Sequence, residues 1–151
     1  MRTVLLLGLL AACGGNQQQT LPDAAYDCTV ETRADTFSAG MMKNGSQNQI
    51  TFKLMESKPA PPSRGDNEWS IDIVDATTQQ PITGAAVTVT PFMPDHNHGT
   101  QIKAVVTEPT PGHYLAKPVN LWMPGLWQVT IKATPTGGTA DAAVFAFCIS
   151  G

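Results

Sequence analysis

The sequence has little charge, few cysteines and no long apolar run. Only 14% of its 151 residues are charged, and 9 Lys and Arg stand against 12 Asp and Glu, a formal net charge of −3. Nucleic acid is therefore not expected as a partner, because basic residues that neutralise phosphates supply most of that affinity. No stretch approaches the ~18 consecutive apolar residues of a membrane-spanning helix. The apolar share of 42% is too high for a disordered chain, so the length predicts one folded domain.

The first residues have the pattern of an export signal. Arg2 supplies one positive charge, a short apolar run follows at residues 4–10, and small residues end it. The segment Leu10-Ala11-Ala12-Cys13 resembles the bacterial lipobox, whose cysteine becomes the lipidated first residue of the mature protein. An ordinary cleaved signal with an incidental cysteine is the alternative.

The lipobox resemblance predicts how the chain is divided and where it works. We expect a lipoprotein signal peptide at residues 1–12, a lipidated tether at 13–27 and a folded domain at 28–151. A lipid on Cys13 would anchor the protein to a membrane on the extracytoplasmic side, in the cell envelope. Gly14 follows the cysteine, without the Asp that signals retention at the inner membrane. The resemblance therefore implies the outer membrane, on its periplasmic or surface side, if the host is Gram-negative.

Two cysteines remain once Cys13 is assigned to the lipid, one near each end of the domain. Disulfides persist in exported proteins. A bridge between Cys28 and Cys148 would close a loop of more than 100 residues, which the chain-entropy model values at ~4–5 kcal/mol. A shared metal site is the alternative, but the two residues lack the close spacing of most thiolate sites. We therefore predict a disulfide.

Apolar and polar residues alternate along most of the domain, with the period of half-buried strands. Pro- and Gly-rich turns separate the alternating segments. The strands expected from this pattern are residues 28–37, 50–55, 69–74, 85–89, 102–108, 113–119, 127–131 and 143–149. The sequence predicts an all-β fold, an immunoglobulin-like antiparallel β-sandwich of about seven or eight strands, with a small barrel as the alternative.

Two loops carry side chains that bind soft metals. His96 and His98 are two residues apart, so in extended backbone they project to the same side. Met93 precedes them, and Met123 lies in a later loop. Thioether sulfur favours Cu(I), whereas imidazole suits copper in both oxidation states as well as zinc and nickel. In an oxidising compartment, this combination favours copper over zinc.

Strand direction predicts that the two loops meet. Successive antiparallel strands reverse the chain, so alternate loops lie at the same end of a sandwich. Two expected strands separate the Met93–His98 segment from Met123, which places both at one end, together with the loop at residues 59–67. His113 begins a strand at the opposite end and is excluded from the site. The alternatives are solvated histidines, and methionines that only close the end of the sandwich as apolar plugs.

An ordered set of motifs adds a family resemblance. The motifs are Pro59-x-Pro61-Pro62-x-x-Gly65-x-Asn67, Gly84-Ala85-x-Val87, Met93-Pro94-x-His96-x-His98-Gly99, Gly112-x-Tyr114 and Met123-Pro124-Gly125-x-Trp127-x-Val129. Over about residues 45–148, this set resembles the YtkA-like domain family, which is related to the FixH-like proteins linked to assembly of copper-containing cytochrome oxidases. The resemblance implies an extracytoplasmic immunoglobulin-like β-sandwich, often lipid-anchored, with suspected copper handling. Many members carry a second Met before the His, where this chain has Asp95, which could bind Cu(II) or cap the turn.

The sequence thus predicts a cell-envelope lipoprotein that binds copper for delivery or sequestration, with a copper-receiving envelope protein as a partner. The four predicted ligands are Met93, His96, His98 and Met123. The alternative is a protein-interaction module that binds no metal and uses the same loops, with Phe92, Trp122 and Met123 as its apolar patch. An enzyme is not expected, because neither a nucleophile elbow nor a Ser/His/Asp or paired-carboxylate arrangement stands out in the sequence.

Overall fold

Strand formation follows the apolar alternation of the sequence. The computed structural model describes residues 26–151, and in it Trp69, Ile71 and Ile73 are fully buried, whereas the intervening Asp72 stays on the outer face of its sheet. Within residues 26–151 there are nine strands and no helix, so no helix there is long and apolar enough to cross a membrane. The predictions for the signal peptide, for Cys13 and for the tether up to residue 25 lie outside the described residues.

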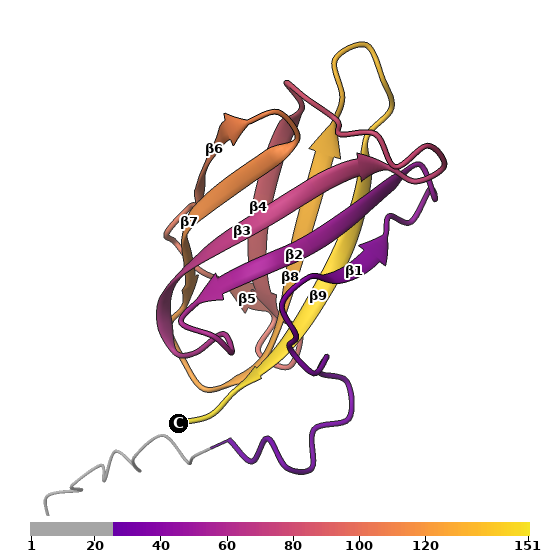
Figure 1. Ribbon diagram of the computed structural model, residues 1–151. Helices are drawn as coiled ribbons and strands as arrows, with labels where there is room; N and C mark the ends of the chain where they lie inside the picture. The colour runs from indigo at the N-terminus through magenta and orange to yellow at the C-terminus, as the bar shows by residue number, and fades with distance from the viewer. Residues whose placement is uncertain (1–25) are drawn as a thin grey trace, which may run out of the picture.

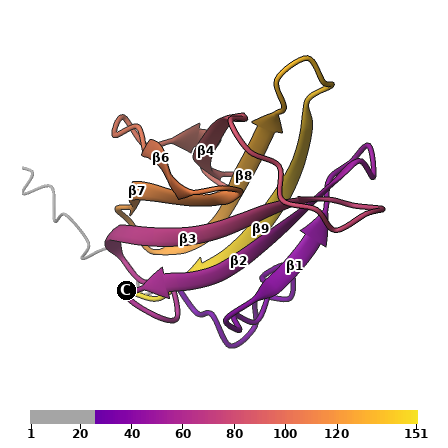
Figure 2. The ribbon, with the colours of Figure 1, turned by 45° about the horizontal axis from the view of Figure 1, so that its top comes forward.

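The strands form two antiparallel sheets packed face to face (Figures 1 and 2). One sheet has the order β1-β2-β3-β7-β6 and consists of β1 (Met41–Asn44), β2 (Ile50–Lys58), β3 (Gly65–Asp75), β7 (His113–Leu121) and β6 (Val105–Thr110). The other has the order β5-β4-β8-β9 and consists of β5 (His98–Gly99), β4 (Ala86–Met93), β8 (Gly125–Thr134) and β9 (Asp141–Ile149). The predicted antiparallel β-sandwich is confirmed, with nine strands in the described part of the chain rather than seven or eight.

Large aromatic side chains fill the space between the sheets. Trp69 of β3 meets Phe147 of β9 edge to face, with ring centroids 5.6 Å apart and an interplanar angle of 86°. Phe52, Phe145 and Trp127 are also fully buried. Each such side chain contributes about 1.5–3 kcal/mol by leaving water, so the core holds the two sheets in a fixed relation. The loops at each end are therefore positioned by a rigid scaffold.

The strand predicted at residues 28–37 is wrong. Residues 26–40, which we call the N-terminal arm, contain no strand and run along the outer edge of β9. Asp35 donates its backbone N–H to the carbonyl of Ala146 at 2.7 Å, and its carboxylate accepts the Ala146 N–H at 2.8 Å. The arm thus covers an edge strand with a few side-chain and backbone contacts instead of a regular ladder.

The disulfide between Cys28 and Cys148 is confirmed, with Cα atoms 5.6 Å apart. It links the start of the arm to the end of β9, the last strand of the chain. Because the bridge spans 120 residues of sequence, it constrains nearly the whole domain.

The segment from Pro91 to Gly99 is more regular than its proline content suggests. β4 continues through Pro91 to Met93, and β5 returns beside it at His98 and Gly99. A Cβ atom on Gly99 would lie only 2.7 Å from the Pro91 carbonyl oxygen, so that carbonyl faces β5. In a strand, the backbone nitrogen and the carbonyl of one residue point to the same side, so the Pro91 nitrogen also faces β5. The absence of an N–H on Pro91 therefore does not affect the pairing of β4 with β8.

Candidate functional site

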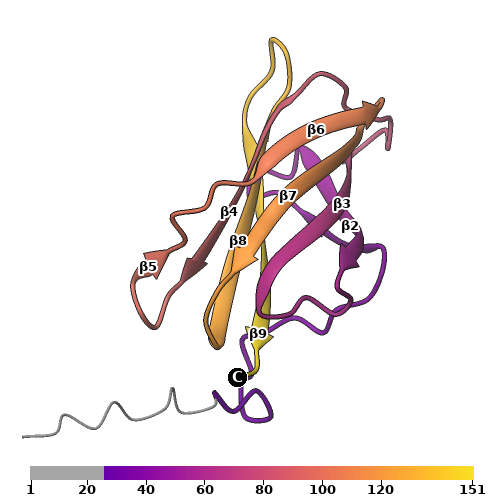
Figure 3. The same ribbon diagram turned by 90° about the vertical axis from the view of Figure 1, so that its left-hand side faces the viewer.

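Three loops meet at one end of the sandwich, as the strand count predicts. The His98 ring stacks on the Trp122 ring, with centroids 5.6 Å apart and an interplanar angle of 24°. Arg64 donates a hydrogen bond from Nε to the Trp122 carbonyl at 2.9 Å. We call this end, the lower one in Figures 1 and 3, the His98 pole. It comprises residues 59–64, 94–98 and 122–124.

His96 and His98 lie together at this pole, but not for the reason expected from extended backbone. Their ring centroids are 5.6 Å apart. His96 sits in a turn and His98 begins β5, and Asn97 between them has a left-handed φ of 52°. Asparagine adopts that conformation more readily than most residues. The turn, rather than a strand period, therefore brings the two imidazoles to one place.

Hydrogen bonding sets which nitrogen of His98 is available. Its Nδ1 lies 3.1 Å from the carbonyl oxygen of Gly99. A carbonyl only accepts, so Nδ1 carries the proton and the neutral ring leaves its Nε2 lone pair free. A backbone carbonyl that holds one ring nitrogen is the usual support for a metal-binding histidine.

Of the two methionines, only Met93 lies deeper than both histidines. Met93 is fully buried, and its Cε would be only 2.5 Å from a Cβ atom on Gly125, so this thioether packs into space that the glycine leaves open. Met123 is half-buried against the core, and its carbonyl accepts a hydrogen bond from Trp127 Nε1 at 2.9 Å. The structure thus places the Met93 thioether in the core, whereas Met123 is half-buried, as His98 is, and His96 is exposed. The ligand roles of the two sulfur atoms stay predictions.

Asp95 makes an ion pair with the N-terminal arm. Arg33 donates from Nη1 to Asp95 Oδ1 and from Nη2 to Asp95 Oδ2, each at 2.7 Å. Arg33 also binds Glu31 from Nε at 2.9 Å and from Nη2 at 2.7 Å. Tyr26 donates its hydroxyl to the same Glu31 carboxylate at 2.7 Å. We call these four residues the arm clamp. Both oxygens of Asp95 are therefore occupied by a guanidinium.

The arm clamp changes the acidity of its carboxylates. Hydrogen bonds from Arg33, then from Tyr26, lower the pKa of Glu31 to about 2. Hydrogen bonding to Arg33 also lowers the pKa of Asp95. Among residues 26–151, no group of three or more His, Cys, Asp or Glu side chains could hold a metal ion. A metal at the His98 pole would rely on the imidazoles with thioether sulfur, which is a donor set for a soft ion.

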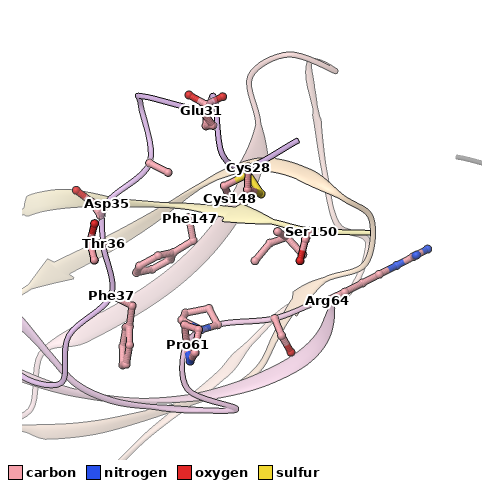
Figure 4. A pocket seen from close by; sticks show the side chains of 14 residues that line it. Cys28, Glu31, Asp35, Thr36, Phe37, Pro61, Arg64, Phe147, Cys148 and Ser150 are labelled. Carbon is pink, nitrogen blue, oxygen red and sulfur yellow. A yellow bond between two sulfur atoms is a disulfide. The ribbon is translucent and has the colours of Figure 1, made fainter. Parts of the chain in front are cut away.

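A groove of about 520 Å³ lies between the arm and residues 59–64, beside the disulfide (Figure 4). Phe37 and Phe147 line it and meet edge to face, with centroids 6.2 Å apart. Glu31 and Asp35 border it as well, but each is already paired with a cation. Since its carboxylates are paired, we assign no ligand to this groove.

A second polar cluster, missed by the sequence analysis, lies on the outer face of β3 and β7. His113 Nδ1 is 2.6 Å from Asp72 Oδ1, and its Nε2 is 3.2 Å from Ser70 Oγ. The order serine, histidine, aspartate is that of a hydrolytic triad. In the sequence, the one sign of this cluster was that Ser70 and Asp72 are two residues apart in a predicted strand. His113 comes near them only because the strand register places it opposite Asp72.

This cluster lacks the other parts of a nucleophilic site. Ser70 lies in β3 between two hydrogen-bonded neighbours, paired with Glu56 on one side and Leu115 on the other. Backbone N–H groups in a central strand are used by the two ladders, whereas an oxyanion hole needs free donors. We therefore interpret the three residues as a hydrogen-bonded network that joins β3 to β7. His113 is also far from the His98 pole, as predicted.

The comparisons with known proteins point to one family. A family model described as YtkA-like matches residues 44–132. No curated protein and no solved structure matches the chain. The matched range contains Met93, both histidines of the pole and Met123, whereas the arm and β9 lie outside it.

Proposed function

The chain belongs to the YtkA-like family, and on that premise we propose that it binds copper at the His98 pole, for delivery or sequestration in the cell envelope. The pair of His96 and His98, with ring centroids 5.6 Å apart, carries the proposal. The Nε2 atom of His98 is free to bind a metal because Nδ1 is held by the Gly99 carbonyl.

The surroundings of the histidines favour Cu(I) over harder ions. The nearest carboxylate in sequence, Asp95, is paired with Arg33 through both oxygens, so Cu(II) or zinc would have to compete with that ion pair for an oxygen ligand. Trp122 stacks on His98, and an indole near a cation adds cation–π attraction. Half-buried Met123 supplies a thioether in the adjoining loop.

A titration tests this proposal. The chain without residues 1–13 is titrated with Cu(I) and with Cu(II), because a free Cys13 thiol would itself bind copper. We expect Cu(I) binding tighter than ~10 μM, and weakening by more than tenfold in His96→Ala/His98→Ala. Unchanged affinity in that double variant would refute the site.

The third histidine provides a matched control. His113 begins β7 at the end of the sandwich away from the His98 pole, where it is hydrogen-bonded to Asp72 and Ser70 of β3. His113→Asn removes the same kind of ligand from a folded chain, so copper affinity should stay within about twofold of the original. A similar loss in both the double variant and the control would mean that copper binds any accessible imidazole.

We also propose that Cys13 carries lipid and anchors the protein on the extracytoplasmic side. The support is the lipobox pattern in the sequence. Cys13→Ser in the full chain should release the protein from the membrane fraction. Retention of that variant in membranes would exclude a lipid at Cys13 as the anchor.

A metal-free interaction module is the second candidate function. Trp122 is 47% exposed and Phe92 38% exposed, so the same pole presents apolar surface suited to a partner protein. Pull-down from envelope extracts distinguishes the two. A metal carrier loses copper but little partner binding when the histidines are replaced, whereas a docking module loses its partner in Phe92→Ser/Trp122→Ser.

A further inference from the structure

We propose that the His98 pole faces the lipid bilayer, whose surface is the partner of the exposed apolar side chains there. The inference rests on the proposed anchor at Cys13 and is independent of whether copper binds. Its basis is where the described chain begins, how firmly that segment is held and which side chains surround it.

The described chain begins at the His98 pole. The Tyr26 hydroxyl donates to Glu31 at 2.7 Å and lies 3.4 Å from Asp95, the residue before His96. The Tyr26 ring is also 3.7 Å from the position of a Cβ atom on Gly125, which follows the Met123 loop. A chain that leads from Cys13 to Tyr26 therefore reaches the domain beside the histidines.

Three independent attachments hold the arm in this place. The disulfide joins Cys28 to Cys148 at the end of β9. Arg33 pairs with Asp95 through two hydrogen bonds. Asp35 exchanges two hydrogen bonds with Ala146. Because these contacts span Cys28 to Asp35, the arm does not swing to the other end of the sandwich without breaking several of them.

Chain length limits how the domain can turn relative to its anchor. Tyr26 is 26 − 13 = 13 residues from Cys13. Thirteen residues reach at most ~45 Å when fully extended. The ten residues of β8 make the sandwich about 30 Å long. To place the opposite pole on the membrane, the tether would have to run along most of that length.

The exposed apolar side chains are unevenly distributed between the two poles. Of the eight large ones in the described chain, five lie along the sides of the sandwich, on strands or in the β5–β6 connection: Met42, Met55, Ile102, Val105 and Val144. Val30 is 73% exposed, Trp122 47% and Phe92 38%, and all three lie at or next to the His98 pole. At the opposite pole, formed by residues 76–85, 111–112 and 135–140, no large apolar side chain of the described chain is exposed. Tryptophan is favoured at the membrane–water interface because its ring is apolar with a polar edge. A cargo bound at the His98 pole would thus face the lipid surface.

Energy transfer to labelled lipids tests the orientation. The full-length lipoprotein is purified in detergent and reconstituted into phosphatidylcholine/phosphatidylglycerol vesicles that carry an acceptor dye on some headgroups. Two variants each add one thiol on an exposed residue: Ala60→Cys at the His98 pole and, as the matched control, Thr139→Cys at the opposite pole. With Cys13 lipidated and Cys28 bridged to Cys148, the added thiol is the single site for the donor dye.

We expect about threefold or more higher transfer from position 60 than from position 139, because the poles are about 30 Å apart. Equal transfer, or higher transfer from position 139, would overturn the proposal. Loss of vesicle flotation in Cys13→Ser verifies the anchor in the same preparation. If the unaltered chain does not float, the orientation fails with the anchor, while the copper titration of the soluble chain still decides the metal site by itself.

Discussion

Arg33 and Asp95 are 62 residues apart in sequence and form a two-hydrogen-bond ion pair, both bonds at 2.7 Å. The pair joins the N-terminal arm to the turn that presents His96 and His98. It also engages both oxygens of Asp95, so a metal ion would have to compete with Arg33 for that carboxylate. One contact thus joins the segment that leads toward the proposed anchor at Cys13 to the turn that carries the candidate copper ligands.

The first prediction concerns pH. Glu31 has its pKa lowered from 4.5 to about 2 in the folded protein, and the pKa of Asp95 is lowered too. Carboxylates with lowered pKa values stabilise the folded arm above their unfolded pKa, and this contribution is lost as pH falls through the folded value. The arm clamp should therefore hold at neutral pH and weaken between pH 4.5 and about 2.

NMR of the Arg33 side chain measures this. The Arg33 Nε–H, which is hydrogen-bonded to Glu31, should keep one chemical shift down to about pH 3 and then move, because in the folded protein the Glu31 carboxylate is protonated only as the pH approaches about 2. Glu31→Gln should remove the pH dependence of that signal. A midpoint near the ordinary value of 4.5 would contradict the lowered pKa of Glu31.

The second prediction separates the sulfur of Met93 from its packing. Met93→Leu keeps nearly the same volume and should cost less than about 1.5 kcal/mol of unfolding free energy, whereas Met93→Ala, which leaves a cavity in a fully buried place, should cost about 2–5 kcal/mol. If the Met93 sulfur binds Cu(I), Met93→Leu lowers copper affinity while stability is nearly kept. Met123→Leu is the matched variant for the half-buried thioether. Urea unfolding and copper titration of the same samples give the two readouts.

The third prediction concerns the buried carboxylate of Asp141, which begins β9 at the end of the sandwich away from the His98 pole. Asp141 is 2% exposed and accepts backbone N–H bonds from Gln47, Gln49, Ile50 and Ala142 at 2.9 to 3.1 Å. Burial opposes its charge, but these donors outweigh burial and lower its pKa. Asp141→Ala leaves several buried donors without a partner and should reduce the unfolding free energy by about 3 kcal/mol.

Thermal or urea unfolding measures the loss in Asp141→Ala. Gly45→Ala should be destabilising for the same reason, because its Cβ would lie 2.1 Å from the Asp141 Cγ and displace the carboxylate. Thr139→Ala, at an exposed position in the neighbouring loop, should stay within about 0.5 kcal/mol of the original chain. Stability of Asp141→Ala equal to that control would contradict the role of the carboxylate.

The fourth prediction concerns the disulfide. A bridge across 120 residues should contribute up to ~4–5 kcal/mol by restricting the unfolded chain, so Cys28→Ser/Cys148→Ser should lower the urea midpoint accordingly. The arm keeps its contacts through Arg33 and Asp35 in that variant. Energy transfer from position 60 should therefore stay above that from position 139, although by a smaller factor. Full loss of the difference would show that the disulfide alone positions the arm.

Much of the fold and the meeting of the loops was predictable from local pattern. Residues such as Trp69, Ile71 and Ile73 alternate with polar neighbours, and a period of two needs only adjacent positions to be recognised. Counting strand reversals was enough to bring the loops of His98 and Trp122 to one end, where their rings stack. Even the pairing of Cys28 with Cys148 followed from there being two cysteines left.

Other features depended on information that no local pattern contains. Bulges between Leu54 and Glu56 and between Asn67 and Trp69 shift the register of β3 against its neighbours. The partner of a given residue across the sheet therefore could not be counted, and the network of Ser70, His113 and Asp72 was missed. The arm was mistaken for a strand because its contacts are made with residues distant in sequence. Arg33 binds Asp95, and Asp35 binds Ala146 at the edge of β9 without forming a regular ladder.

The sequence by itself determined the alternation that makes two sheets, the direction in which each loop leaves them and the residue types available for metal binding. The tertiary structure alone decided which way those side chains point: Met93 into the core, the histidines to the surface and Asp95 onto Arg33. The physical reason is range. Alternation is a property of neighbouring residues, whereas burial and ion pairing depend on groups that only the packed sheets bring within a few ångströms.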